Sequence, residues 1–353
     1  MTVRLPAEWE AQDAIQLTWP HADSDWLYLL PEVETLYTEL VQRISTAARV
    51  LIAAPAARAA ALQQQFDASL PGRVRCYAAT SNDTWARDHG PITISTEQGL
   101  RLLDFRFNGW GGKFEAAQDN ALTAELKRLG AFPNATLQAV DMVLEGGAIE
   151  SDGRGTLLTT AACLLNRNRN PDLDRGAIER ALGELLGVRK INWLQHGALA
   201  GDDTDSHIDT LARLCPDNTL LYQACDDPQD EHFADLAAMA RELAALTDAT
   251  GSPYRLLPLP WPGAQHDPED GHRLPATYAN FLICNGLVLV PTYADPNDDI
   301  ALAQVAEAFP GYRVEGLDCR TLIRQHGSLH CITMQLPAGV LQDEQAADGG
   351  PQA

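Results

Sequence analysis

Cys331 carries the most reactive side chain in this sequence, because a cysteine thiolate is a strong nucleophile. It ends the stretch His326-Gly-Ser-Leu-His-Cys331 and is followed by apolar Ile332. Alone, such a cysteine is most often an inert buried thiol. Catalysis by cysteine also needs a histidine that moves protons and carboxylates that orient the histidine or the substrate. Short stretches rich in Gly, Asn, Trp or Asp contain these residue types, namely Asp88, Glu145, His207 and Asp209.

The acidic groups narrow the class of substrate. A cysteine protease or amidase stabilises a developing oxyanion with hydrogen-bond donors, so several carboxylates near the reacting carbon would raise its barrier. A guanidinium is the opposite case, because it is a planar cation made only of donors, which carboxylates bind with paired hydrogen bonds. The pattern therefore predicts a small cationic guanidinium substrate whose central carbon is attacked by Cys331. The bound cation would help to keep the thiol deprotonated.

The composition agrees with a small cationic partner and argues against others. The sequence has 48 acidic and 26 basic residues, for a formal net charge of -22. Nucleic-acid binding needs a basic surface, so we expect no nucleic-acid partner. We see no secretory signal and no apolar run of membrane-spanning length, and expect no membrane partner. Seven cysteines without a Cys-x-x-Cys pair indicate neither a disulfide framework nor a zinc ribbon, which favours a cytoplasmic location.

Helical and strand signals alternate along the chain, which predicts a mixed α/β protein. Apolar residues at helical spacing alternate with short apolar runs that are typical of strands. The expected helices are 30–46, 121–129, 174–186, 233–246 and 300–309. The expected strands are 50–54, 100–107, 155–160, 188–194, 219–222, 254–259, 281–291 and 312–317. The stretch 262–275 is rich in turn-forming and charged residues, which predicts a mobile loop beside a site.

An ordered series of motifs covers nearly the whole chain. The series comprises Pro6-Ala-Glu-Trp-Glu10, Leu17-Thr-Trp-Pro20, and the segments 82–91, 108–112, 145–147, 204–209, 280–285, 295–298 and 330–333. In this order the motifs resemble those of the agmatine deiminases and bacterial peptidylarginine deiminase-like proteins of the guanidino-group modifying superfamily. The order of the series is far more specific than any one of its members.

The resemblance implies a pentein fold, an α/β propeller of five ββαβ units with pseudo-fivefold symmetry around a central active site. The candidate residues recur along the chain at roughly one unit length or its double, which is compatible with such units. We expect residues 1–337 to form a single catalytic pentein domain. The polar residues 338–353 are expected to form a disordered tail.

The resemblance also assigns roles to the candidate residues. It implies that Cys331 is the nucleophile and His207 the general acid and base. Glu145 would hold His207 or one guanidinium nitrogen, while Asp88 and Asp209 would bind the remaining nitrogens. The implied reaction is agmatine deimination to N-carbamoylputrescine and ammonia through a covalent thiouronium on cysteine, a step of putrescine and polyamine metabolism. It needs no metal and no organic cofactor.

The far end of the substrate decides between agmatine and arginine. An amine requires an acid, an α-carboxylate requires an arginine, and a peptide requires an open groove. Asp202 and Asp203 are the candidate partners of a distal amine, and Trp85 and Trp110 are further candidate substrate contacts. With the strong negative charge, they favour agmatine.

Two departures from the family pattern concern the pocket beside Cys331. Many agmatine deiminases have Gly-Gly-Gly-Asn-Ile before the His-Cys pair, where this chain has Gln325-His-Gly-Ser-Leu329. It also has Ser206 where Gly is frequent. Both departures leave the catalytic residue types unchanged.

Other functions stay open at this point. A free-arginine or protein-arginine deiminase would use the same chemistry. The run Asp205-x-His207-x-Asp209 with His196 could instead be a metal site in a metallohydrolase, although it matches no His-Glu-x-x-His pattern. A binding protein that has lost catalysis is a third alternative. A homo-oligomer and closure of 262–275 over the site are also left open.

Overall fold

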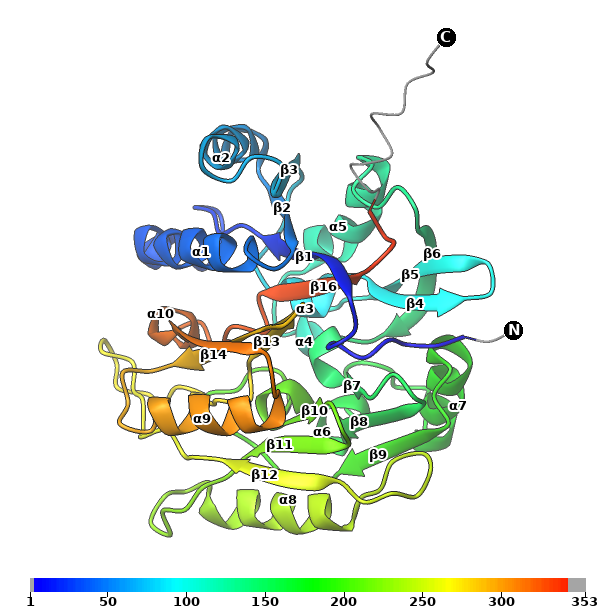
Figure 1. The fold of residues 1–353 in the computed structure, drawn as a ribbon, viewed down its shortest axis with the longest axis vertical. Helices are drawn as coiled ribbons and strands as arrows, with labels where there is room; N and C mark the ends of the chain where they lie inside the picture. The colour runs from blue at the N-terminus through cyan, green and yellow to red at the C-terminus, as the bar shows by residue number, and fades with distance from the viewer. Residues whose placement is uncertain (1–2, 342–353) are drawn as a thin grey trace.

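Five separate β-sheets make up the framework of the protein. A computed structural model describes residues 3–341, and sixteen strands within this range form the sheets. The longer helices lie on the outside of the strands (Figure 1). One sheet has four strands in the order β16-β1-β2-β3, and the other four have three strands each. The described part of the chain therefore has the α/β fold that the alternation predicted.

Four sheets repeat one pattern. In each, an antiparallel pair of strands is followed by a helix, and the next strand runs parallel to the second strand of the pair. The first two sets are β4 (Ile92–Thr96), β5 (Gly99–Arg106), α5 (Ala117–Arg128) and β6 (Thr136–Val143), then β7 (Glu150–Ser151), β8 (Thr156–Thr160), α7 (Arg175–Leu186) and β9 (Lys190–Leu194). The other two are β10 (Ala212–Cys215), β11 (Thr219–Gln223), α8 (Phe233–Ala245) and β12 (Arg255–Leu259), then β13 (Leu282–Cys284), β14 (Leu287–Thr292), α9 (Asp298–Ala308) and β15 (Arg313–Asp318). The helix supplies the crossover that a parallel return requires.

The fifth sheet joins the two ends of the described chain. β16 (Thr333–Pro337) pairs antiparallel with β1 (Gln12–Thr18), and β2 (Arg49–Ala54) and β3 (Val74–Ala78) continue the sheet in parallel. α1 (Leu30–Ile44) precedes β2, and α2 (Ala56–Ser69) connects β2 to β3. The sequence pattern did not predict β1, because the buried Gln12 and Gln16 interrupt its apolar run.

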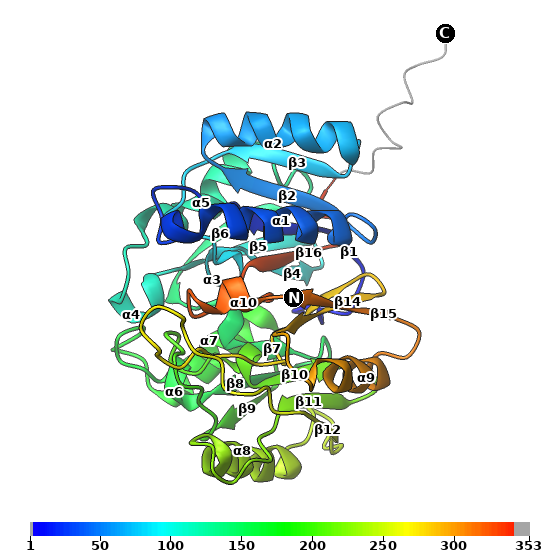
Figure 2. The ribbon, with the colours of Figure 1, turned by 90° about the vertical axis from the view of Figure 1, so that its left-hand side faces the viewer.

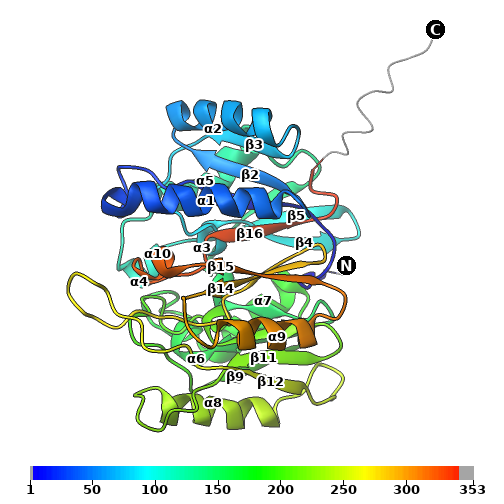
Figure 3. The same cartoon turned by 60° about the vertical axis from the view of Figure 1, so that its left-hand side comes forward.

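Short helices lie in the connections between strands and carry or directly precede most of the candidate residues. They are η1 (Leu27–Leu29), α3 (Ala86–His89), α4 (Gly109–Gly112), η2 (Gly146–Ala148), α6 (Ala161–Leu164), η3 (Ile208–Thr210) and α10 (Arg320–Ile323). Figures 2 and 3 show α2 at one end of the long axis, α8 at the other, and the strands between them. The longer helices therefore cover the sheets, while several short helices lie beside the candidate catalytic residues.

The expected helices and strands are confirmed within a few residues, with one correction. The stretch 281–291 is two strands, β13 and β14, and not one. Asn285 and Gly286 form the turn between them, with φ of 45° and 82°. An Asn-Gly pair with positive φ at both positions is the preferred two-residue hairpin turn. The continuous apolar character of both strands, which are buried, concealed this turn signal.

The apolar core follows from the sequence pattern of the helices. Along α1 the buried residues recur at helical spacing and face β2, and they are Val33, Leu36, Tyr37, Leu40, Val41 and Ile44. They belong to the largest hydrophobic cluster, which also takes in Trp19 and much of β14. Burial of such a stripe stabilises a helix more than its intrinsic propensity does.

The segment before β1 crosses the molecule and is held at several points. Arg4 bridges to Ser95, and the backbone N–H of Leu5 donates to the carbonyl of Leu186. Gly187 follows α7 with φ of 72°, and a Cβ there would lie 1.8 Å from the carbonyl oxygen of Val3. Glycine is therefore required at this contact.

The end of the described chain extends past the predicted domain boundary. The backbone N–H of Ala338 donates to the carbonyl of Ala11, and Val340 is fully buried. The tail predicted from residue 338 is therefore wrong for 338–341, and its remainder, 342–353, lies outside the described residues. Between residues 3 and 341, none of the helices combines the length and the apolar character that a membrane span requires.

Candidate active site

The structure brings Asp88, Glu145, His207, Asp209 and Cys331 together, each from a connection between sheets. Asp88 lies on α3, Glu145 precedes η2, His207 and Asp209 flank the start of η3, and Cys331 lies two residues before β16. Glu145, His207 and Asp209 have no exposed surface, and Asp88 and Cys331 are 4% exposed. Residues that are far apart in the sequence thus meet at one buried place.

A pocket of about 150 Å³ leads to this place. Asp88 and Cys331 form part of its wall, together with the aromatic side chains of Trp85, Trp110 and Phe114. Of the predicted substrate contacts, Trp85, Trp110 and Asp203 line the pocket. Asp202, Glu145 and Asp209 are not among its lining residues. The carboxylate of Asp202 accepts hydrogen bonds from Thr204 and Ser206 within its own loop.

Cys331 lies among acceptors and acids. Its Sγ donates to Oδ1 of Asn280 at 3.4 Å and lies 4.0 Å from Oδ2 of Asp209. Burial raises the pKa of the Cys331 thiol well above its usual value, and the charges of Asp209 and Asp88 raise it further. The thiol is therefore protonated at neutral pH in the free protein, and a cation in the pocket would favour the thiolate.

Asp88 is held by neutral donors. Nε1 of Trp110 donates to Oδ2 at 2.9 Å and the backbone N–H of Gly147 donates to Oδ1 at 3.0 Å. Burial raises the pKa of Asp88 well above its usual range, with Asp209 and Glu145 adding to the effect. A Cβ on Gly147 would lie 2.5 Å from Nδ1 of His207 and 2.9 Å from Oδ1 of Asp88, so only glycine fits between them.

His207 is buried and has an unusual lack of partners. Neither ring nitrogen has a hydrogen-bond partner among the residues that the structure describes, although Nδ1 lies 3.6 Å from Oδ1 of Asp88. Burial lowers the pKa of His207 to about 3. The ring is therefore neutral in the free site, and its nitrogens are available to accept and return a proton.

Glu145 is paired with an arginine that the sequence reasoning missed. Nε of Arg169 donates to both carboxylate oxygens, at 2.8 and 3.0 Å, and both side chains are fully buried. Arg169 also donates to Asp205 at 2.7 Å and to the carbonyl of Thr204. The only hint in the sequence is the polar run 166–170, which has no recognisable spacing relative to Glu145. Arg169 thus ties Glu145 to the loop that carries His207.

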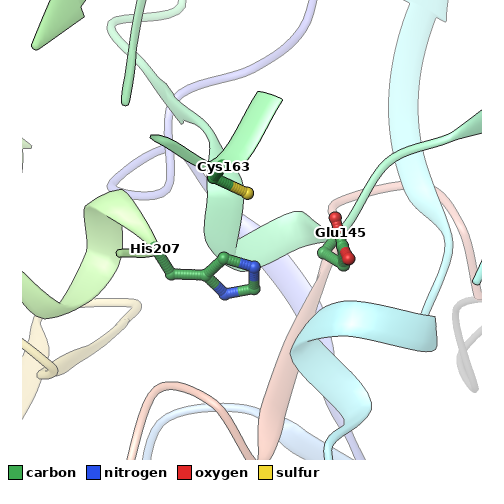
Figure 4. Close-up of side chains that lie close together, drawn as sticks. All are labelled: Glu145, Cys163 and His207. Atoms are coloured by element: carbon green, nitrogen blue, oxygen red, sulfur yellow. The ribbon is translucent and has the colours of Figure 1, made fainter. Parts of the chain in front are cut away.

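Figure 4 shows Glu145, Cys163 and His207 close together, with the imidazole below Cys163 and directed toward Glu145. Their possible ligand atoms all lie within 4.8 Å of one another, the separation expected of a metal site. Arg169 already neutralises Glu145, which makes the group a poor match for a cation.

The metal site considered from the sequence is not assembled among the described residues. His196 lies at the surface and pairs with Glu242 at 2.6 Å, while His207 is fully buried. Neither of the two potential ligand groups within residues 3–341 contains Asp205, Asp209 or His196. The geometry therefore gives no support to the metallohydrolase alternative.

The mouth of the pocket is shaped by the departures noted in the sequence. His326 has a φ of 65°, a left-handed conformation that favours glycine, and it lines the pocket. Nδ1 of His326 lies 2.7 Å from the carbonyl oxygen of Gly201, and the ring stacks on His272 at 5.3 Å. His272 belongs to the segment 262–275, so this segment does lie beside the site, as predicted. Its mobility stays a prediction.

Comparison with known proteins agrees with this chemistry. A family model described as Porphyromonas-type peptidyl-arginine deiminase matches residues 4–337. A relative from Yersinia pestis, provisionally named agmatine deiminase, is 34% identical over 95% of both chains. A structure of C. jejuni agmatine deiminase with substrate bound is 39% identical, with a TM-score of 0.87 over 96% of this chain and 97% of the other. A structure from Porphyromonas gingivalis, provisionally named arginine deiminase, is 49% identical, with a TM-score of 0.89 over 96% and 99%.

These similarities and the site define a hydrolase that acts on the C–N bonds of a guanidino group. Within that class, the chain belongs to the Porphyromonas-type peptidyl-arginine deiminase family. The name of the family does not settle the substrate, because the relatives include proteins named for agmatine and for arginine.

Replacing Arg169 with Met should destabilise the protein by about 3–5 kcal/mol, because it leaves Glu145 buried without a cation. Arg106→Met is the matched control, since Arg106 pairs with Asp141 at the surface and the loss should be at most about 1 kcal/mol. Urea unfolding of both variants checks the difference. Equal losses in the free energy of unfolding would show that the buried Glu145 does not need Arg169 for stability.

The raised pKa of Cys331 predicts how the thiol reacts in the free protein. At pH 7 a haloacetamidine, which carries an amidinium, should alkylate Cys331 at least about tenfold faster than iodoacetamide, after correction for the two rates with glutathione. The cation should stabilise the thiolate and the ionised form of Asp88. The iodoacetamide rate should keep rising as the pH increases above 7.

Asp88→Asn should reduce this preference, because asparagine cannot ionise when the cation arrives. Inactivation rates with loss of the free Cys331 thiol, followed by mass spectrometry, give the measurement. Equal corrected rates for the two reagents in the unsubstituted protein would contradict a site that needs a cation to form the thiolate.

Proposed function

We propose that this protein is an agmatine deiminase, which hydrolyses agmatine to N-carbamoylputrescine and ammonia. The observation that carries the proposal is the acidic lining of the pocket that leads to Cys331. Asp25, Asp83 and Asp203 are part of its wall, and no Arg or Lys side chain occurs among its described lining residues. A distal ammonium would be attracted there.

The same pocket disfavours the alternatives. The α-carboxylate of free arginine would face the carboxylates of Asp25 and Asp203 without a cationic partner. Burial raises the pKa of Asp83 to about 7, with smaller contributions from the nearby charges of Asp119 and Asp25. A peptidyl-arginine would need an open groove, whereas the loops at 203–204 and 325–327 both border this pocket.

The reaction begins with the arrival of the guanidinium between Asp88 and Asp209. Its positive charge favours the thiolate, and the Cys331 proton passes to the neutral His207. The thiolate attacks the guanidinium carbon and forms a C–S bond. His207 then donates its proton to the leaving nitrogen, the C–N bond breaks, and ammonia departs.

The second half of the reaction releases the product. The covalent intermediate is an S-alkylthiouronium on Cys331. Water gives a proton to His207 and attacks the same carbon, and the C–S bond breaks. His207 returns its proton to the sulfur, and the hydroxyl proton of the adduct is lost to solvent as the ureido product leaves. In this account Glu145 does not hold the substrate, because Arg169 occupies its carboxylate. It acts on His207 through its charge, since a carboxylate oxygen lies within 4.8 Å of the imidazole.

We further infer that the five sheets are arranged as a pentein propeller around this site. The repeated pattern of two strands, a helix and a parallel strand supports the inference. The likeness to agmatine deiminase structures also supports it, and an amidinotransferase structure from Microseira wollei shares the fold at 12% identity with a TM-score of 0.53. We expect the protein to act in the cytoplasm, in the formation of putrescine.

Ammonia release with agmatine, free arginine and an arginine-containing peptide tests the substrate. We expect turnover with agmatine, at least about a hundredfold less with either arginine form, and none in Cys331→Ser. Preference for either arginine form would contradict the substrate while leaving the chemistry intact.

Asp203→Asn should raise KM for agmatine about tenfold and leave kcat nearly unchanged, because the distal amine is far from the reacting carbon. Asp172→Asn is the control, since Asp172 is exposed and lies outside the pocket. An unchanged KM in Asp203→Asn would rule out Asp203 as the partner of the amine.

A further inference from the structure

We propose that Glu8 and His330 are positioning residues of the active site, in which His330 connects Glu8 to Asp209 and holds that carboxylate for the guanidinium. The inference rests on the proposed deiminase function. It gives a catalytic task to the N-terminal segment around Glu8, whose motif stands out in the sequence but is remote from Cys331 along the chain. Neither residue touches the substrate pocket.

His330 is fully buried between two carboxylates. Nδ1 lies 2.7 Å from Oδ2 of Asp209, and Nε2 lies 2.8 Å from Oε1 of Glu8. Because an ionised carboxylate can only accept, we assign a proton to Nδ1, which donates to Asp209, while Nε2 faces both the Glu8 carboxylate and NH2 of Arg213. Oδ1 of Asp209 has no hydrogen-bond partner among the described residues. His330 therefore fixes one oxygen and leaves the other available to the substrate.

Glu8 in turn is held by two arginines. NH1 of Arg87 lies 2.9 Å from Oε1 of Glu8, and NH2 of Arg213 lies 2.6 Å from Oε2. The same NH2 lies 3.0 Å from Nε2 of His330, and Arg213 also pairs with Glu150. The carboxylate of Glu8 thus supplies the negative charge that lets two buried guanidinium groups lie behind the site.

The placement of His330 is coupled to that of the nucleophile. The backbone N–H groups of His330 and Cys331 both donate to Oδ1 of Asn280, at 2.8 and 3.3 Å. The amide of Asn280 also donates to the carbonyl of Asp209 at 3.3 Å. Asn280 therefore holds the backbone of His330, the thiol of Cys331 and the backbone of Asp209 in one network.

The two aspartates around the substrate differ in a way that this network explains. Burial alone would raise the pKa of Asp209, but the hydrogen bond and charge of His330, with the charges of His207 and Arg213, lower it below the usual value. Asp88 has only neutral donors, and its pKa is raised. Asp209 is therefore the more readily ionised of the two in the free site, and a bound guanidinium would favour the ionised form of Asp88.

Two substitutions of His330 separate its two hydrogen bonds. The amide nitrogen of Asn can take the place of Nδ1 and donate to Asp209, whereas the longer Gln places its amide near Nε2 and Glu8. We expect His330→Asn to keep kcat/KM for agmatine within about threefold, and His330→Gln to lose about tenfold or more. The acid limb of the pH profile should move to higher pH in His330→Gln, because Asp209 loses its donor and its pKa rises.

Glu8→Gln provides an independent arm, with Glu10→Gln as its matched control. Glu10 lies in the same segment and is also paired, with Arg4, but it makes no contact with His330. Glu8→Gln should lower kcat by about fivefold or more and Glu10→Gln by less than about twofold. Thermal unfolding of each variant identifies any loss of folded protein, so that rates refer to the folded fraction.

The outcomes distinguish the proposed deiminase function from the positioning role of Glu8 and His330. No ammonia from agmatine with the unsubstituted protein would overturn the proposed function. Normal turnover in that protein, with equal losses in His330→Asn and His330→Gln or with an unshifted pH profile in His330→Gln, would overturn the positioning role alone. So would equal effects of Glu8→Gln and Glu10→Gln.

Discussion

The rest of the structure depends on one constraint: the active site buries more carboxylates than it has cationic side chains to pair with them. An ionised carboxylate is costly to bury unless it is paired. Glu145 is paired with Arg169, and Asp209 accepts a hydrogen bond from His330, whereas Asp88 receives hydrogen bonds only from neutral donors. The carboxylate without a charged partner thus lies beside Cys331, where a guanidinium would pair with it. The site is arranged so that its substrate supplies the missing positive charge.

The fold satisfies this constraint with elements that lie outside its regular sheets. Connections between sheets bring the reactive groups together, and β1 with β16 joins the ends of the described chain behind them. Several of the connections hold residues other than glycine in left-handed backbone conformations, at Trp110, Asp205, Ser206 and His326. Such conformations cost free energy and persist where surrounding contacts determine them, which is common at active sites. The repeated sheets provide a rigid frame, and the strain lies in the loops.

Much of this organisation could be predicted from the sequence, and the remainder could not for physical reasons. Helices such as α1 and α7 were predictable because their apolar residues recur at helical spacing. The types of the five reactive residues were predictable because catalysis by a cysteine needs a histidine and carboxylates. Arg169 and Glu8 were not, since their roles depend on contacts between segments that no local pattern records. Asp202 looked equivalent to Asp203, and only the backbone of its loop shows that its carboxylate is already occupied.

The most direct test of the account is to trap the covalent intermediate on Cys331. The protein would be mixed with agmatine, quenched in acid within milliseconds to seconds, digested and analysed by mass spectrometry. The account predicts a transient gain equal to the mass of agmatine less one ammonia on the peptide that contains Cys331, absent from Cys331→Ser. Turnover of agmatine in Cys331→Ser at the full rate, or an adduct on a different residue, would contradict it.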